Sequence, residues 1–387
     1  MKRILWRGLL GLALLPGVAG AGAALNVRGL LDLGLVSSVA GDTLNRLTFG
    51  DSNFDPYRLR LFLDAQLSPN FELHVQTILH EGFGHVIQAD GVYVLWTPWL
   101  GRDLALEAGK IPWPIGTYAP RTYSDKNPLI GTPLMYQYRT SLSWDLPALS
   151  VDDQVSRAGT GQFLNNPDHH YLPVVDERWW DVGGVLIGSQ RPFEYSLGVV
   201  QGSPGWPSPG ADDTPGATTL GRLGLVPTPG IRVGVSGANG TWMPAWYELI
   251  LPPGKTLREY HETTLMADAE LARGPFELRG EGVKRRWETI RSGNLDTRSG
   301  YVEARWALPQ GAWLAARAEG LRFGDVTTSA AVTRPWDDGI DRYEAVVGYR
   351  ITQDVRAKLG FQRTRRYPFA SERLQNDMVA GSLSIRF

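Results

Sequence analysis

Residues 57–80 read YRLRLFLDAQLSPNFELHVQTILH, and this stretch decides the class of fold. Two runs in it alternate apolar with polar side chains, and only Ser68-Pro69-Asn70 lies between them. A period of two is the signature of a β-strand with one apolar and one polar face, and a short polar break is typical of a tight turn. The segment therefore predicts a β-hairpin.

The same alternation returns along the chain, as in 25–36, 355–362 and the last residues before Phe387. The segments that connect the predicted strands are by turns short and long. The short ones are 68–70, 99–101, 190–192, 227–230, 273–275, 308–311 and 352–354. The long ones fall near 40–55, 81–85, 112–176, 202–216, 240–257, 288–298, 324–340 and 366–375. Fifteen connections imply sixteen strands, with both termini on the short-turn side.

This arrangement predicts an all-β fold, a closed antiparallel transmembrane β-barrel of about sixteen strands. In hydrocarbon every backbone N–H and C=O must be paired, and a strand can satisfy this only in a barrel without edges. A soluble sandwich or solenoid would also show alternation, but it leaves the switching between short turns and long loops unexplained.

Composition excludes several classes of function. The 387 residues carry 39 Lys and Arg against 40 Asp and Glu, a formal charge of −1, so no nucleic acid partner is expected. There is no cysteine, which removes disulfides, thiolate catalysis and cysteine-based metal sites. The histidines and acidic residues show no coherent metal cluster, and no cofactor is predicted.

The N-terminus carries an export signal. Lys2, Arg3 and Arg7 precede a short apolar stretch over 8–18, and small residues at 19–23 fit a cleavage site. We therefore expect residues 1–23 to be a cleaved signal peptide, and residues 24–387 to be a mature barrel in the bacterial outer membrane.

Inward-facing arginines are the most informative polar feature. Sixteen strands leave a lumen too wide for side chains to fill. In each strand, the alternate positions that carry polar side chains should face this lumen, and we call these positions the inward parity. By that parity the arginines of the lumen are Arg28, Arg58, Arg60, Arg222, Arg279, Arg317, Arg342, Arg350 and Arg356. Arginine binds carboxylates and phosphates well, but acidic residues share the same parity, so cross-strand pairing is the more frequent expectation for any one of them.

The connection 112–176 is far longer than a usual loop, and loops of this length are normally functional or disordered. We expect it to fold into the lumen as a constriction loop. Arg121 and Lys126 are then the candidate charges of the constriction, Asp125 is their counter-charge, and Arg139 lies in the same loop. The alternative places these residues on the outer rim among lipopolysaccharide.

The run Glu107-Ala-Gly-Lys-Ile-Pro-Trp-Pro-Ile-Gly116 closes a strand and opens this loop. With Asn127-Pro128-Leu129 and Tyr136-Gln137-Tyr138, it resembles the strand-to-loop signature of the phosphate-selective porin O/P family. The resemblance implies a trimeric channel whose third loop forms the constriction and whose cationic residues pass anions. The terminal Phe387 is similar to the signal that the outer-membrane assembly machinery reads.

We therefore predict an outer-membrane porin for passive diffusion of small hydrophilic solutes, with a mild leaning to anions. Its expected partners are outer-membrane lipid, lipopolysaccharide, the assembly machinery and two further copies of the chain. One alternative is a plugged barrel that acts as an adhesin or surface-binding protein. Another is an outer-membrane enzyme, but no G-x-S-x-G elbow is present and the chain is not expected to be one.

Overall fold

The computed structural model describes residues 24–37, 57–80, 87–98, 103–161, 171–176, 180–206, 216–369 and 371–387. The predicted signal peptide over 1–23, the predicted turn at 99–101 and the predicted loops at 40–55 and 81–85 lie outside these residues. Among the described residues, no helix is long and apolar enough to cross a membrane.

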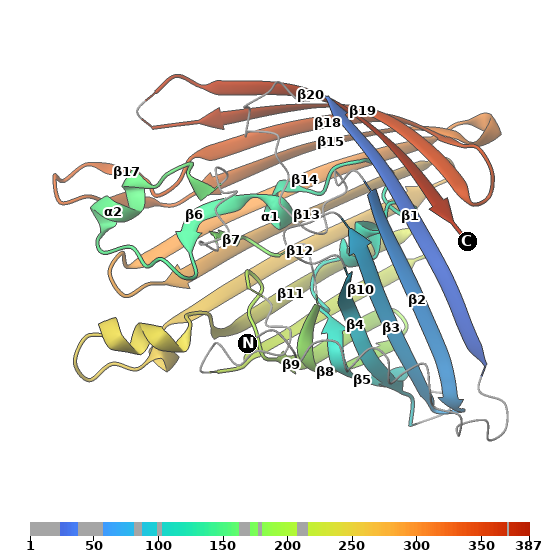
Figure 1. The fold of residues 1–387 in the computed structure, drawn as a ribbon, viewed down its shortest axis with the longest axis horizontal. Coiled ribbons are helices and arrows are strands. Elements are labelled where there is room, and N and C mark those ends of the chain that lie inside the picture. Colours follow the sequence, from blue (N-terminus) through green and yellow to red (C-terminus); the bar gives the residue numbers. More distant parts are fainter. Residues whose placement is uncertain are drawn as a thin grey trace.

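Sixteen antiparallel strands form one closed barrel, as the sequence predicts (Figure 1). Its strands are β1 (Leu25–Ser37), β2 (Tyr57–Ser68), β3 (Phe71–His80), β4 (Ile87–Trp96), β5 (Leu104–Pro112), β8 (Trp180–Gln190), β9 (Phe193–Val200), β10 (Thr218–Thr228), β11 (Ile231–Thr241), β12 (His261–Arg273), β13 (Phe276–Glu288), β14 (Asn294–Ala307), β15 (Ala312–Phe323), β18 (Gly339–Arg350), β19 (Val355–Tyr367) and β20 (Leu374–Arg386).

Smaller elements lie in the connections. They are β6 (Arg139–Ser143), β7 (Tyr171–Pro173), β16 (Asp325–Thr327), β17 (Thr333–Pro335), α1 (Leu134–Gln137), α2 (Val151–Ser156) and the 3₁₀ turns η2 (Ala119–Thr122), η4 (Ala245–Ile250), η5 (Leu257–Glu259) and η6 (Pro309–Gly311). The long connection runs from 113 to 179 rather than from 112 to 176, because Pro112 and Trp180 still pair as strand residues.

The ring closes where β1 pairs with β20, with Leu30 opposite Arg386 and Ser37 opposite Val379. The terminal Phe387 extends this ladder: its N–H donates to the Gly29 carbonyl at 3.1 Å, and the Gly29 N–H donates back at 2.7 Å. The sheet therefore has no free edge at its seam.

The two faces of the wall differ in chemistry as the alternation predicts. Large apolar side chains such as Leu197, Val302 and Leu359 are exposed on the outside. On the inside, charged side chains such as Arg285 and Glu303 are buried. An apolar exterior around a polar interior, without sheet edges, is the arrangement of a barrel that spans a membrane.

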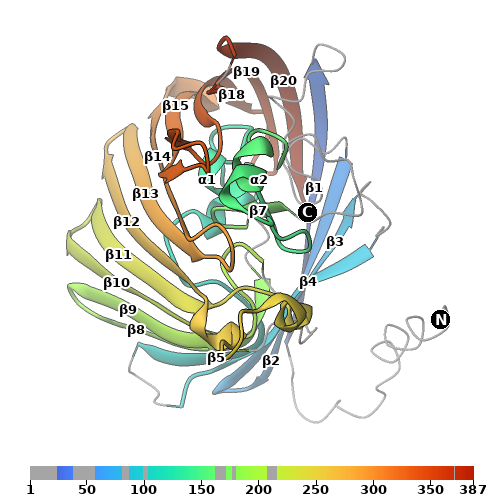
Figure 2. The same cartoon turned by 90° about the vertical axis from the view of Figure 1, so that its left-hand side faces the viewer.

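The buried core lies inside the ring and not between two sheets. Tyr118, Leu134 and Tyr136 of the long connection pack against Tyr301 and Trp287 of the wall in one cluster. Figure 2 looks into the barrel and shows α1, α2 and β7 within the ring of strands. The connection between β5 and β8 therefore supplies the interior of the molecule.

Candidate functional site

Residues 113–143, which we call the inner loop, turn into the barrel directly after β5. Gly116 has a φ of 64°, and a Cβ there would lie 2.8 Å from a Glu281 carboxylate oxygen, so the turn requires glycine. The Gly116 N–H donates to the Ser236 hydroxyl at 3.0 Å, and the Thr117 N–H donates to Glu281. These contacts hold the start of the loop against β11 and β13.

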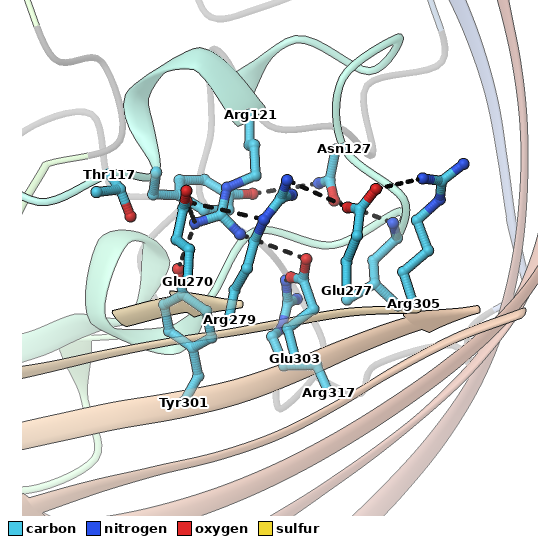
Figure 3. A network of polar contacts seen from close by, with 12 residues as sticks. Thr117, Arg121, Asn127, Glu270, Glu277, Arg279, Tyr301, Glu303, Arg305 and Arg317 are labelled. Atoms are coloured by element: carbon cyan, nitrogen blue, oxygen red, sulfur yellow. Dashed lines mark hydrogen bonds and ion pairs between the residues drawn. The ribbon is translucent and has the colours of Figure 1, made fainter. Parts of the chain in front are cut away.

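Arg121 fastens the next turn to the wall (Figure 3). Its guanidinium donates to the Tyr301 hydroxyl at 3.0 Å, lies 3.4 Å from Glu303 and 3.9 Å from Glu270. It also lies over the Tyr118 ring at 5.1 Å and is only 4% exposed. The sequence predicts that Arg121 faces solutes, but the wall carboxylates and the Tyr rings enclose it, so it is a buried anchor.

The inner loop then reaches the opposite wall. The Ser124 hydroxyl donates to Asp32 on β1, and the Tyr123 hydroxyl donates to the Gln76 amide oxygen on β3 at 2.7 Å. The guanidinium of Arg60 on β2 lies 5.3 Å from the centre of the Tyr123 ring. Contacts on β11 and β13 and on β1 to β3 show that the loop crosses the lumen.

Lys358 on β19 holds the turn of the loop at this far side. Its ammonium donates to three backbone carbonyls, those of Ser124 at 2.7 Å, Asn127 at 2.7 Å and Leu129 at 3.0 Å. On the neighbouring β18, Glu344 accepts the N–H groups of the next two loop residues, 130 and 131, at 2.9 and 2.8 Å. Charged wall residues thus satisfy a backbone that makes no strand pairing there.

The return of the loop uses further wall charges. Glu319 accepts the Leu134 N–H at 2.5 Å, and Glu281 accepts the Tyr136 hydroxyl at 2.5 Å. Arg342 donates to the Gln137 side chain at 3.1 Å. The sequence predicts Arg58, Arg60, Arg317 and Arg342 as lumen residues, and the structure points them inward but buries all four beneath the loop.

Arg139 belongs to the end of the inner loop and lies away from the aqueous path that the sequence predicts for it. Its guanidinium lies 3.3 Å from Asp176 and donates to the Tyr171 carbonyl at 3.2 Å, so it joins β6 to β7 and the segment after them. The same region rests on Asp337, whose carboxylate accepts the N–H groups of Ser141 at 2.7 Å and Gly159 at 2.6 Å.

Charges that remain accessible gather on the short-turn side of the inner loop. A cavity of 230 Å³ lies there, which we call the basic cavity. Its charged lining is Asp125, Lys126, Glu277, Arg279, Arg305, Arg350 and Arg356. Five cations thus face two carboxylates.

Both carboxylates of the basic cavity already lie within ion-pair distance of cations in its lining. Glu277 lies 2.7 Å from Arg305 and 3.2 Å from Arg279, the row visible in Figure 3. Asp125 lies 3.8 Å from the exposed ammonium of Lys126, and it does not pair with Arg121 as the sequence predicts, because Arg121 is enclosed elsewhere. Within the described part of the chain, Arg350 and Arg356 form no side-chain hydrogen bond or ion pair.

The other predicted lumen arginines are paired. Arg28 lies 2.5 Å from Asp64, and Arg222 lies 2.6 Å from Asp268. Sequence reasoning missed Lys358 and Arg305 as site residues. Both could have been found, because Arg305 on β14 and Lys358 on β19 occupy alternate positions that face the lumen. Nothing in the sequence shows which loop carbonyls Lys358 binds.

Together the closed barrel, its polar interior and the loop across its lumen define a porin-like barrel. No protein-family model and no curated protein matches the sequence. Solved structures do match over nearly the whole chain. OmpF of Salmonella typhi in complex with daunomycin has a TM-score of 0.56 and 10% identity, covering 95% of this chain and 98% of its own.

Two further structures are similar to the same extent. The outer membrane channel DcaP of Acinetobacter baumannii has a TM-score of 0.57 and 7% identity, with 95% of this chain and 99% of that chain covered. A loop-deletion mutant of OmpT, an outer membrane protein of Vibrio cholerae, has a TM-score of 0.55 and 10% identity, with 94% and 99% covered. At these identities the likeness shows a common fold.

Proposed function

We propose that the protein is a porin of the bacterial outer membrane, through which small hydrophilic solutes diffuse passively with a mild preference for anions. Selection would depend on the width left beside the inner loop and on the accessible charges, and it involves no covalent chemistry and no cofactor. The similarity to the outer membrane channel DcaP supports a channel function.

The observation that carries the anion preference is the basic cavity. Two of its five cations, Arg350 and Arg356, have no counter-charge within ion-pair distance among the described residues. Unpaired guanidinium groups in a water-filled lumen with low-dielectric walls raise the local concentration of anions. Lys126, with 56% of its side chain exposed, adds a third accessible cation.

The finer parts of the proposal have separate support. A trimer is proposed because a trimer form of Vibrio cholerae OmpT shares the fold, with a TM-score of 0.54 at 9% identity. Distant kinship to the phosphate-selective porin O/P family is proposed from the run 107–116 together with the motifs at 127–129 and 136–138. The constriction role of the loop is proposed from its contacts with both walls of the lumen.

The test is single-channel recording of the purified full chain in a planar bilayer under a KCl gradient. We expect discrete steps in groups of three and a reversal potential on the anion side. The variant Arg350→Gln/Arg356→Gln should move this potential toward the cation side while steps persist. Its matched control, Arg191→Gln/Arg273→Gln, removes two exposed charges at the same end of the barrel and should leave the potential unchanged.

Two results would contradict parts of the proposal. A cation-side potential in the unaltered protein would remove the anion preference but keep the channel. Equal shifts in the double variant and its control would show that the basic cavity does not select ions.

A plugged barrel that binds at the cell surface is the second candidate, favoured by one observation. The inner loop contacts the wall at β11, β13, β18 and β19 as well as at β1 to β3, so it occupies much of the lumen. If a folded, heat-modifiable barrel conducts no current, this function replaces the porin.

A further inference from the structure

Six basic side chains lie on the outer face of the barrel near the long-loop ends of its strands. This set, which we call the outer basic belt, comprises Lys284 and Arg286 on β13, Arg298 on β14, Arg322 on β15, and Arg363 and Arg365 on β19. Strand alternation fixes their direction, since Lys284 and Arg286 flank the fully buried Arg285 of the lumen. The belt therefore faces the membrane side of the wall.

Three of these cations stand directly opposite one another. Lys284 pairs in register with Arg298, and Arg298 pairs with Arg322. Like charges at directly opposed positions destabilise a sheet, so a row of three requires a compensating charge.

The described residues of the protein supply carboxylate partners for three of the six cations of the belt. Each of three outward carboxylates is bonded to one arginine: Asp296 to Arg286 at 2.7 Å, Asp341 to Arg322 at 2.5 Å, and Asp377 to Arg363 at 2.7 Å. Arg365 donates only to the neutral Gln375 amide, at 3.2 Å. Lys284 and Arg298 have no side-chain hydrogen bond or ion pair among the described residues. Three positive charges, those of Lys284, Arg298 and Arg365, therefore have no ion pair with a carboxylate in the described part of the chain.

The belt is confined to one sector of the wall. The cross-strand row of Lys284 continues through Leu265, Gly237 and Gly221 to Leu197 on β12, β11, β10 and β9. All four of these outward positions are neutral. Charge is therefore not a general feature of this cross-strand row, and the belt belongs to β13, β14, β15 and β19.

The height of the belt matches the edge of the hydrocarbon. On β14 the outward positions run from the exposed Trp306 through Ala304 and Val302 to Arg298, eight residues away. At about 3.4 Å per residue and a tilt of about 40°, this is about 21 Å along the membrane normal, close to the apolar band of about 25 Å in such barrels. The belt thus lies at headgroup level on the long-loop side.

We propose that the outer basic belt binds the phosphate groups of lipopolysaccharide in the leaflet that the long loops face. The planar guanidinium of Arg298 can donate two parallel hydrogen bonds to one phosphate, and Lys284 opposite it adds a point charge. A phosphate between these two side chains removes their mutual repulsion. Arg365, two strands beyond β15, offers a contact for a second phosphate on the same lipid or its neighbour.

The experiment measures binding of lipid A by the detergent-purified full chain, with bisphosphorylated and dephosphorylated lipid A as probes. The unaltered protein should bind the phosphorylated lipid about tenfold or more tightly than the dephosphorylated one, since charge-assisted hydrogen bonds are lost without phosphate. Lys284→Gln/Arg298→Gln should abolish this preference. Arg191→Gln/Arg273→Gln removes the same charge at the other end of the barrel and should keep it.

A second measurement separates binding from a structural role. Without lipid, Lys284→Gln/Arg298→Gln should melt at the same or a higher temperature than the unaltered barrel, because a like-charge contact is gone. With bisphosphorylated lipid A, the unaltered barrel should gain more in melting temperature than the variant.

Four results would overturn the proposal. They are equal binding of both lipids by the unaltered protein, unchanged preference in Lys284→Gln/Arg298→Gln, equal loss in the control, and displacement of the lipid by millimolar inorganic phosphate alone. A lower melting temperature of the variant without lipid would assign the two residues to the structure of the wall instead.

Discussion

Arg121 joins the inner loop to two strands through a single buried guanidinium. Replacing it by glutamine leaves Glu303, which is 2% exposed, with Arg317 at 3.6 Å as its remaining ion-pair partner. Removing one member of a buried charge pair costs about 3 kcal/mol. We expect Arg121→Gln to lower the free energy of unfolding by about this amount, measured by guanidinium titration in detergent micelles.

Lys126 in the same loop is the matched control. More than half of its side chain is exposed, and its partner Asp125 lies 3.8 Å away, so the pair contributes below about 1 kcal/mol. Lys126→Gln should leave the unfolding midpoint unchanged within error. Equal losses in the two variants would show that Arg121 is not an anchor.

At the scale of elements, residues 139–161, which include β6 and α2, are docked on the connection between β17 and β18. Asp337 accepts the Ser141, Gly159 and Asp338 N–H groups there, yet burial raises the pKa of Asp337 to about 7. In the undocked state this carboxyl titrates near a pKa of about 4. Between about pH 4 and pH 7 the docked state therefore holds a proton that the undocked state releases, and docking weakens as the pH rises.

Hydrogen exchange at residues 139–161 tests this pH dependence. After correction for intrinsic exchange rates, protection should be about 80-fold lower at pH 8 than at pH 5, because docking loses nearly a factor of ten per pH unit between pH 5 and pH 7. Asp337→Asn removes this titrating group and should show a much smaller difference in protection between the two pH values, to which the neighbouring Asp338 still contributes. Protection that stays constant or rises with pH in the unaltered protein would contradict a raised pKa for the docked carboxyl.

At the scale of the whole molecule, the seam between β1 and β20 decides whether the ring closes. A Cβ on Gly29 would overlap the Phe387 ring, so Gly29→Val forces this ring out of its contact beside the two backbone hydrogen bonds of the seam. We expect the heat-modifiable, folded fraction to fall several-fold in refolding from denaturant. At Gly282 a Cβ meets nothing closer than 4.0 Å, and Gly282→Val should fold as the unaltered chain does. A normal yield from Gly29→Val would show that the ring contact is dispensable.

Strand number and pairing could be read from the sequence because each strand pairs with a near neighbour in the chain. The hairpin predicted over 57–80 is β2 and β3, and even its turn lies at Pro69 and Asn70. Period-two alternation also assigned inward direction correctly to Arg58 and Arg342, since direction in a strand depends only on parity.

The interior could not be read in this way. Parity has no meaning in a loop, and Arg121 is buried because Glu303, 182 residues further on, stands opposite it. Lys126, five residues away, stays exposed although it has the same charge and the same local composition. Which loop residues meet the wall depends on the path of the whole segment through the lumen, and no local pattern encodes that path.

The seam has one more consequence, which concerns the order of events during biogenesis. Because β1 bonds to β20, the first strand made must wait for the last one before either edge is satisfied. Until then an incomplete sheet presents unpaired N–H and C=O groups at both margins, which are templates for aggregation. The final ladder also joins the two most distant parts of the chain, the slowest kind of contact to form. Closure is therefore a post-synthetic step, and the nascent chain needs protection for as long as its C-terminal strand is missing.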